Sequence, residues 1–150
     1  MNLSEMEAMA RYIRGKLVEM SCKAQTPHLG SALSCVDILV AAYWGVLAID
    51  PKNPRSPERD RFILSKGHAV TALYAVLACQ GFFPEELLDR FAEAGSCLAE
   101  QPSPGCVSGL ELATGSLGHG LPAGIGMAFA GRLQGFSYRV FVLMSDGECN

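Results

Sequence analysis

Charged residues are scarce in this chain, and neither sign of charge dominates. They make up 18% of the 150 residues, and 15 acidic against 12 basic side chains give a net charge of −3. Proteins that bind nucleic acid or membrane surfaces usually carry a basic surplus or a basic cluster, so we expect neither as a partner. Hydrophobic residues, at 49%, are enough to build a core and exclude a disordered tail.

Long apolar runs, a secretory leader and paired cysteine motifs are also missing. The longest apolar run covers residues 38–49, which is too short to cross a bilayer and suits a buried helix. Glu5, Glu7 and Arg11 interrupt the region where a signal peptide has its apolar stretch, so we expect a cytoplasmic protein. The six cysteines form no Cys-x-x-C pair. In a reducing compartment they are expected to be reduced core residues rather than disulfides or zinc ligands.

Hydrophobic periodicity predicts helices that alternate with short buried strands. Strands are expected at 61–64 and 138–144, and loops at 25–30, 50–60 and 95–118. The expected helices are 4–22, capped by Ser4; 34–44; 69–80, ended by Gly81; a segment that begins at Pro84; and 121–133. Gly30 is expected to supply unusual backbone dihedrals in the first loop. This alternation indicates an α/β fold in which a parallel sheet is flanked by helices.

The helix expected at 121–133 is unusual because it contains Gly124, Gly126 and Gly131. Each glycine costs a helix about 1 kcal/mol relative to alanine. Glycines kept at that cost suggest that another element packs close to the helix backbone. We also expect large faces such as this helix to associate with a partner.

All three histidines lie in glycine-bearing turns that precede expected helices. His28 is in His-Leu-Gly, His68 in Lys-Gly-His and His119 in Leu-Gly-His-Gly. Imidazoles donate to anionic oxygens and move protons near neutral pH, and helix N-termini favour anions. We therefore expect a site for a phosphate-bearing ligand. A zinc ion held by the three histidines is the alternative, although their spacings of 40 and 51 residues match no local metal motif.

Two further segments carry candidate ligand contacts. Residues 114–120 form a loop of small residues whose backbone N–H groups could surround a ligand, but its spacing is neither that of a Rossmann fingerprint nor that of a P-loop. Asp146 follows the strand at 138–144, where open α/β sheets place their chemistry. Its carboxylate suits Mg²⁺ or Ca²⁺ beside a diphosphate, and an ordinary surface turn is the alternative.

Four segments together resemble the N-terminal, thiamine-diphosphate-binding part of transketolases. They are, in the family's order, His28–Leu39, Asp60–Ala69 with Ala72–Ala75, Thr114–Leu121 and Ser145–Asn150. The resemblance covers nearly the whole chain and is closest to the half-length subunits of split transketolases. It implies the thiamine-diphosphate-binding fold of the PP type, incomplete at its C-terminus. Residues 1–150 would then be the N-terminal portion of that domain, with the remainder of the enzyme outside this chain.

The resemblance implies cofactor contacts at matching positions. Asp146 matches the aspartate of the family's Gly-Asp-Gly motif, which holds the divalent metal on the diphosphate. Gly147 matches the glycine whose N–H meets the diphosphate. Gly115 and Leu117 match a loop that packs on the cofactor and contacts it through the backbone.

The resemblance also implies two catalytic histidines. His68 matches a histidine near the diphosphate and the substrate, and His28 matches one near the thiazolium and the substrate's oxygens. Three positions depart from the family pattern. Ser145 stands where the family has the first glycine of Gly-Asp-Gly, and Gln101 stands where a substrate-facing histidine is usual. His119 occupies a position often filled by glutamine and receives no role.

The implied reaction transfers a two-carbon ketol unit from a ketose or ketose phosphate to an aldehyde. Thiamine diphosphate and Mg²⁺, or Ca²⁺, are the implied cofactors. A C-terminal transketolase half, as a separate chain, would supply the pyrimidine-binding domain and its activating glutamate within a dimer of heterodimers. The family's second metal ligand, an asparagine, would lie beyond Asn150. A component like deoxyxylulose-phosphate synthase, or a non-catalytic interaction module derived from transketolase, are the alternatives.

Overall fold

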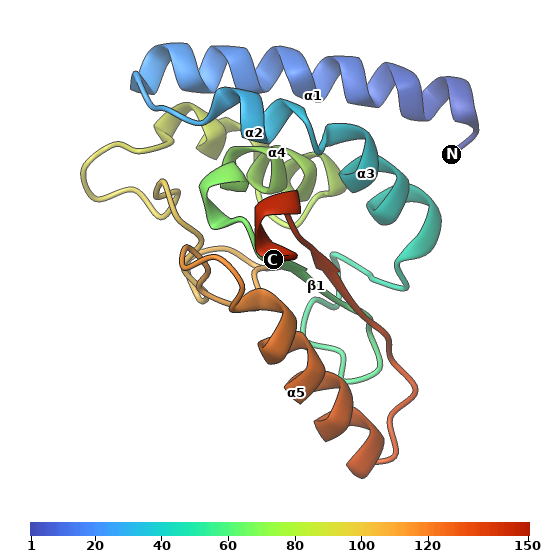
Figure 1. Cartoon of the computed structure of the whole chain (residues 1–150). Helices are drawn as coiled ribbons and strands as arrows, with labels where there is room; N and C mark the ends of the chain where they lie inside the picture. The colour runs from blue at the N-terminus through green and yellow to red at the C-terminus, as the bar shows by residue number, and fades with distance from the viewer.

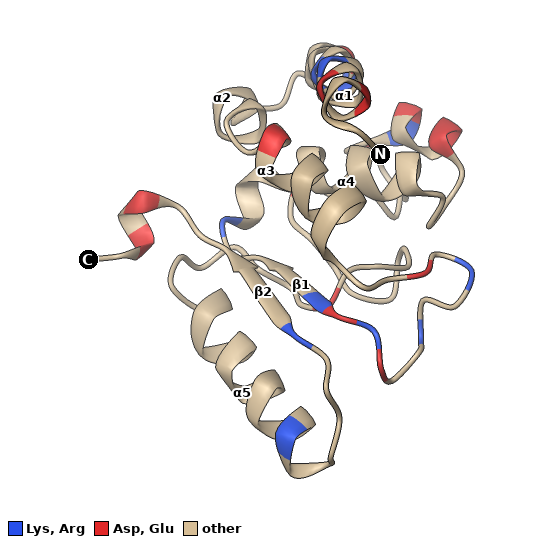
Figure 2. Cartoon of the chain, turned by 90° about the vertical axis from the view of Figure 1, so that its right-hand side faces the viewer, with Lys and Arg blue, Asp and Glu red and all other residues tan.

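A two-stranded parallel sheet lies at the centre of the computed structural model, which describes residues 1–150 (Figure 1). Strands β1 (Arg61–Leu64) and β2 (Val140–Leu143) pair with Arg61 opposite Val140 and Leu64 opposite Leu143. Helix α5 covers one face of the sheet, and the N-terminal helices lie over the other (Figure 2). The helices are α1 (Leu3–Ala24), α2 (Leu29–Leu33), α3 (Val36–Ala41), α4 (Val70–Gln80) and α5 (Gly120–Leu133). The predicted α/β fold with a flanked parallel sheet is confirmed.

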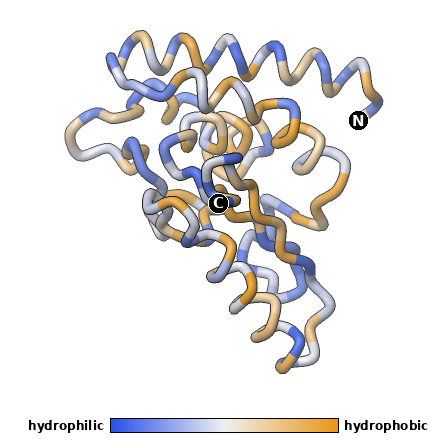
Figure 3. Tube along the Cα trace, viewed as in Figure 1, coloured by the Kyte–Doolittle hydropathy of each residue, from blue (hydrophilic) through white to orange (hydrophobic).

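Helix α1 is amphipathic, and its apolar residues recur at helical spacing. Ala10, Ile13, Leu17 and Met20 are buried against α3 and α4, and the charged residues of the helix lie outside this buried stripe (Figure 3). The predicted cap at Ser4 is wrong. Asn2 caps the helix instead, because its side chain accepts from the Glu5 N–H at 3.0 Å while the Glu5 carboxylate accepts from the Asn2 N–H at 2.8 Å.

Helix α4 is the central helix of the core. All residues from Val70 to Ala78 are buried, which is typical of a helix that is apolar on every side. It ends as predicted at Gly81, whose φ of 88° lies in the left-handed region that glycine adopts without strain. A short 3₁₀ turn, η2 (Gly67–Ala69), leads from β1 into this helix. His68 is therefore held between the sheet and the core.

The segment between α1 and β1 differs from the prediction. Residues 29–33 form the short helix α2, which the apolar pattern does not predict, and the helix expected at 34–44 is divided into α3 and a π-helical turn, η1 (Ala42–Val46). The left-handed backbone dihedrals in this loop belong to Gln25, with φ of 52°, and His28, with φ of 73°, and not to Gly30, which lies within α2. The chain turns sharply at His28, so helix α2 begins earlier than the apolar pattern suggests.

One stretch, Leu29–Val46, has the length and composition of a membrane-spanning helix, with a mean hydropathy of 1.6. This is weak evidence for a membrane span, because core helices of globular proteins meet the same criteria. In this structure the stretch comprises α2, α3 and η1. The cytoplasmic location stays a prediction.

Other elements follow the prediction with shorter bounds. The helix expected from Pro84 is a 3₁₀ helix, η3 (Glu85–Arg90), and the strand expected at 138–144 is limited to β2. The loop expected at 95–118 contains no helix or strand beyond one isolated bridge. The expectation that the cysteines are core residues is wrong for most of them. Cys35 is buried and Cys79 is half-buried, but the other four lie in exposed positions: Cys22, Cys97, Cys106 and Cys149.

The glycines of α5 pack closely as predicted, with one exception. A Cβ atom at Gly124 would lie 2.6 Å from Val142 Cγ2, and one at Gly131 would lie 2.4 Å from the Tyr138 ring. Both glycines therefore let α5 approach β2 and the segment before it. Gly126 has open space and makes no such contact.

Candidate functional site

Parallel pairing places the carboxyl ends of β1 and β2 at the same edge of the sheet. The turn after β1 and the turn after β2, η4 (Asp146–Glu148), therefore lie side by side, and the Ser65 N–H donates to the Leu143 carbonyl at 2.9 Å. Figure 2 shows the C-terminal turn just beyond the end of β2. This edge is where open α/β sheets bind ligands.

A hollow of about 410 Å³ opens at this edge. Three of the predicted site residues line it, namely His68, Asp146 and Gly147. Asp146 is the only carboxylate in the lining. The full lining is Ser31, Ser34, Cys35, Ile38, Lys66, His68, Leu143, Met144, Ser145, Asp146 and Gly147.

The two predicted catalytic histidines face each other. The ring centroids of His28 and His68 are 5.0 Å apart, and His68 Nε2 lies 2.9 Å from the Ser31 hydroxyl. Burial lowers the pKa of His68, and the nearby charges of His28 and Lys66 lower it further. His68 is thus held largely neutral at pH 7, in the form that can accept a proton.

Lys66 is a functional candidate that the sequence analysis missed. Its side chain is buried, and its ammonium donates to the Ser31 carbonyl at 2.9 Å and to the Ser34 hydroxyl at 3.1 Å. A fixed positive charge in the wall of the hollow favours an anionic ligand. The turn that carries Lys66 stands out in the sequence, but nothing in the sequence indicates that this lysine points inward toward α2.

Gln101 lies against the same turn, as do Thr114 and Gly115. A Cβ atom at Gly67 would lie 2.3 Å from the Thr114 carbonyl oxygen and 2.7 Å from Gln101 Oε1. A Cβ atom at Gly115 would lie 3.2 Å from the same amide oxygen. Gly67 therefore has to be glycine for the long loop to pack on the turn that carries His68.

The remaining candidates do not line the hollow. Leu117 is 52% exposed, and Gly115 is also exposed, beside Gln101. His119 is exposed at the start of α5 and does not join the other histidines. No group of three His, Cys, Asp or Glu side chains is arranged to hold a metal ion. The arrangement therefore gives no support to the three-histidine zinc site.

Glu148 is a second residue that the sequence analysis missed. Burial tends to raise the pKa of its carboxyl, but hydrogen bonds from Gly118, Ser65 and Ser145 lower it to about 2. The carboxylate is therefore ionised at neutral pH and fully engaged within the protein. Ser145, which departs from the family's glycine, is one of its donors through both N–H and hydroxyl.

The residues around the hollow fit a diphosphate with one divalent cation. Asp146 is exposed and makes no hydrogen bond through its carboxylate, so both oxygens can face a cation. A Cβ atom at Gly147 would meet nothing within 4 Å, which leaves room for a phosphate beside its backbone. Without a three-ligand cluster, this chain would supply one carboxylate ligand to such a cation. The other ligands would be phosphate oxygens, water or residues outside it.

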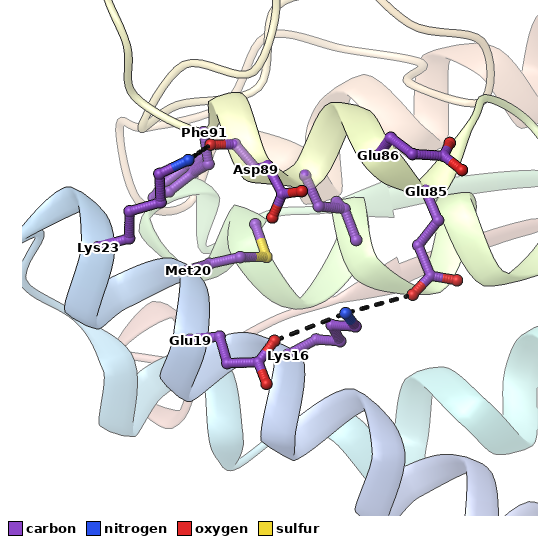
Figure 4. Close-up of a pocket in the computed structure, with 9 residues that line it drawn as sticks. Lys16, Glu19, Met20, Lys23, Glu85, Glu86, Asp89 and Phe91 are labelled. Carbon is purple, nitrogen blue, oxygen red and sulfur yellow. Dashed lines mark hydrogen bonds and ion pairs between the residues drawn. The ribbon is translucent and has the colours of Figure 1, made fainter.

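A second hollow, of about 290 Å³, lies between α1 and η3 (Figure 4). One of its lysines, Lys16, is paired with two of its carboxylates. Lys16 Nζ lies 3.5 Å from the Glu19 carboxylate and 3.7 Å from that of Glu85. It contains no histidine and none of the predicted site residues, so it is not a candidate for the diphosphate site.

Comparison with known proteins agrees with this geometry. Residues 5–147 match the family described as transketolase, thiamine diphosphate binding domain. The chain belongs to the transketolase family. One subunit of the apulose-4-phosphate transketolase of Phocaeicola vulgatus is 42% identical over 148 residues, which are 99% of this chain and 52% of that protein. The 6-deoxy-6-sulfo-D-fructose transketolase subunit SqwG of Clostridium sp. is 40% identical over 144 residues, covering 96% and 52%.

Solved transketolases share the fold of this transketolase-family chain. The crystal structure of transketolase from Campylobacter jejuni superposes with a TM-score of 0.92 at 30% identity, over 99% of this chain and 24% of that one. The chain spans about half the length of the curated relatives named above. The resemblance predicted from the four segments is thus confirmed, including its likeness to transketolase subunits.

Proposed function

We propose that this chain binds the diphosphate end of thiamine diphosphate together with Mg²⁺, or Ca²⁺ in its place. Assembled with a C-terminal transketolase half, it would transfer a two-carbon ketol unit from a ketose or its phosphate to an aldehyde. The observation that carries the proposal is the hollow at the ends of β1 and β2. There Lys66, His68, Asp146 and Gly147 come together from two parts of the sequence that are almost 80 residues apart.

Each of these residues has a role that its chemistry supports. The Asp146 carboxylate is a metal ligand, and the Gly147 backbone and the Lys66 ammonium favour phosphate oxygens. Bound thiamine diphosphate supplies the electron sink that allows a carbon–carbon bond of the ketose to break. The chain's own part is to fix the cofactor's charged end.

We assign the contacts with the substrate to His28, His68 and Gln101. His68 is held largely neutral, so its unprotonated ring nitrogen can accept a proton from a substrate hydroxyl and return it. His28 is exposed and tilted by 54° to the His68 ring, in a place where it can donate to sugar oxygens. Gln101 can hydrogen-bond a sugar but cannot carry a proton at neutral pH. A sugar or sugar phosphate is therefore the proposed substrate class.

A partner chain is supported by the surface of α5. Leu121, Ile125, Phe129 and Leu133 recur every four residues along this helix, and each is at least 41% exposed. Such a row of large apolar side chains is typical of an interface. Relatives that match this chain are named transketolase subunits. We infer that a complementary transketolase half covers α5, in an assembly such as a dimer of heterodimers.

The test is a calorimetric titration of thiamine diphosphate in Mg²⁺. It uses this chain alone, and then the chain mixed with the complementary C-terminal half of a split transketolase. We expect binding in the mixture, and Asp146→Ala to abolish the Mg²⁺-dependent part. The control is Asp89→Ala, which removes an exposed carboxylate of η3 that does not line the hollow. This variant should bind thiamine diphosphate like the wild type.

Two results would count against the proposal. Binding of Asp146→Ala at wild-type affinity would remove the metal assignment. No binding by the chain alone or in the mixture would remove the cofactor proposal and favour a non-catalytic module that only pairs with another enzyme. Ketol transfer from a ketose phosphate, compared with reaction of pyruvate, then separates transketolase chemistry from that of deoxyxylulose-phosphate synthase.

A further inference from the structure

The Glu148 carboxylate joins three separate segments at the edge of the sheet. Its Oε1 atom accepts from the Ser65 hydroxyl and from the Gly118 N–H at 2.9 Å. Its Oε2 atom accepts from the Ser145 N–H at 2.7 Å and from the Ser145 hydroxyl at 3.0 Å. Ser65 follows β1, Gly118 lies in the loop before α5, and Ser145 lies between β2 and η4. One side chain thus fixes all three turns to one another.

Ser65 extends this network into the buried layer. Its side chain is fully buried, and its hydroxyl accepts from the Gly120 N–H at 3.2 Å while donating to Glu148. A Cβ atom at Gly120 would lie 2.4 Å from Ser65 Oγ, so the start of α5 touches the turn after β1 directly. A displacement of Glu148 would therefore release both the 114–120 loop and the C-terminal turn.

The neighbouring residues of the turn are left free by this arrangement. Asp146 and Gly147 line the hollow, whereas the Glu148 carboxylate is engaged by its four donors and is not part of the lining. We propose that Glu148 is a positioning residue for the diphosphate site: it holds the η4 turn so that Asp146 and Gly147 are presented in one fixed geometry. This inference rests on the proposed function, because it assigns Glu148 a part in the same site.

The substitution Glu148→Gln separates positioning from simple electrostatics. Removing a negative charge near an anionic ligand should by itself strengthen diphosphate binding. A glutamine amide, however, would turn an NH₂ group toward one pair of donors, and the network would open. Positioning therefore predicts weaker binding, by roughly 10-fold or more, as expected for loss of charge-assisted hydrogen bonds.

The experiment uses the complete chain with its complementary half. Calorimetry gives the Kd of thiamine diphosphate in Mg²⁺ for wild type, Glu148→Gln and the control Glu86→Gln, which alters an exposed carboxylate in η3. Amide hydrogen exchange without cofactor follows Gly118, Gly120 and Ser145. We expect weaker binding and faster exchange at these amides for Glu148→Gln only. If that variant does not fold, Ser65→Ala, which removes one donor, takes its place with the same expectations.

The outcomes are distinguishable from failure of the proposed function. Wild-type affinity in Glu148→Gln, while Asp146→Ala loses binding, would overturn the positioning role and leave the cofactor proposal standing. Weaker binding without faster exchange would also overturn it, because the three turns would then still be held together and the loss of affinity would not come from their positioning. Absence of binding by the wild type would remove the proposed function, and this inference with it.

Discussion

Asp60 illustrates how a single buried carboxylate can join distant parts of this chain. It is 3% exposed, and it accepts from the Ala48 N–H at 2.9 Å and from the Arg139 N–H at 2.7 Å. The Arg139 guanidinium also pairs with it at 2.6 Å. Asp60 thereby ties the entrance of β1 to the entrance of β2 and fixes the register that brings their carboxyl ends together.

Asp60→Ala should lower the free energy of unfolding by about 2–3 kcal/mol. Buried N–H groups that lose a charged acceptor account for this cost, and the half-exposed Arg139 adds little. Urea unfolding of the folded chain or of its assembly with the partner measures the change. Asp50→Ala, on the loop before β1, is the matched control, and an equal loss in both variants would contradict the role of Asp60.

Because Asp60 titrates, we also expect its contribution to the free energy of unfolding to depend on pH. Burial tends to raise the pKa of Asp60, but hydrogen bonds from Arg139 and Ala48 hold it below the usual 3.8. Because the folded-state pKa is the lower one, the contribution is present above about pH 4 and is lost as pH falls through that folded-state pKa. Urea midpoints should therefore fall less steeply in acid for Asp60→Ala than for wild type. Parallel curves would contradict this account.

Single residues are predictable where local sequence decides their role. His28, His68, Asp146 and Gly147 lie in recognisable turns, so the sequence alone marks them as candidates, and three of them, His68, Asp146 and Gly147, line the hollow. Lys66 and Glu148 escape such an analysis because their partners are far away in sequence: Lys66 meets α2, and Glu148 meets the turns at the starts of α4 and α5. Such pairings depend on how strands align, which a linear pattern does not contain.

At the scale of elements, α5 packs on β2 through selected glycines. Gly124 is buried against Val142, whereas Gly126, two residues later, faces open space. The two positions share a helix and a residue type but not an environment. They separate the effect of helix propensity from the effect of packing.

Gly124→Ala should destabilise the protein by about 1–3 kcal/mol, because the added methyl forces α5 away from β2. Gly126→Ala should stabilise it by up to about 1 kcal/mol, because it gains helix propensity without a clash. Thermal and urea unfolding of both variants measure the difference. Equal effects of the same sign would show that α5 does not approach β2 as closely as described.

Elements with strong periodicity or clear end signals are predictable. The strand at 61–64, the helix ended by Gly81 and the helix with close-packed glycines all form as expected. Helix α2 is not predictable, because its five residues are too few to show a period and because His28 makes the turn before it in place of a glycine. The helix expected from Pro84 forms as the 3₁₀ helix η3, which packs against α4.

The whole molecule presents an apolar row on α5 that the fold leaves uncovered. Phe129 is 62% exposed within this row. Phe129→Asp should therefore weaken association with the complementary transketolase half by roughly 30-fold or more, as expected for a central aromatic contact. Sedimentation or mass photometry of the mixture measures this. Val18→Asp, at an exposed apolar position of α1, is the control, and unchanged association of Phe129→Asp would contradict the interface.

The fold class and the general place of the site are predictable at this scale, because alternating helices and strands imply a parallel sheet with its chemistry at the carboxyl ends. The set of residues that line the hollow is not predictable from the sequence. Whether Gly115, Leu117 or His119 would line it depends on how the 95–118 loop, which carries Gln101 and Thr114, packs on Gly67. None of the three lines it in the structure of this chain.

We propose that the turns after β1 and β2 hold the diphosphate and its metal. The decisive experiment is a crystal structure of the chain assembled with its complementary half, grown with thiamine diphosphate and Mn²⁺ in place of Mg²⁺. We expect the anomalous signal of the ion within about 2 Å of an Asp146 oxygen, with the diphosphate beside Gly147 and Lys66. An ion and diphosphate bound elsewhere, with this hollow filled by solvent, would contradict the account.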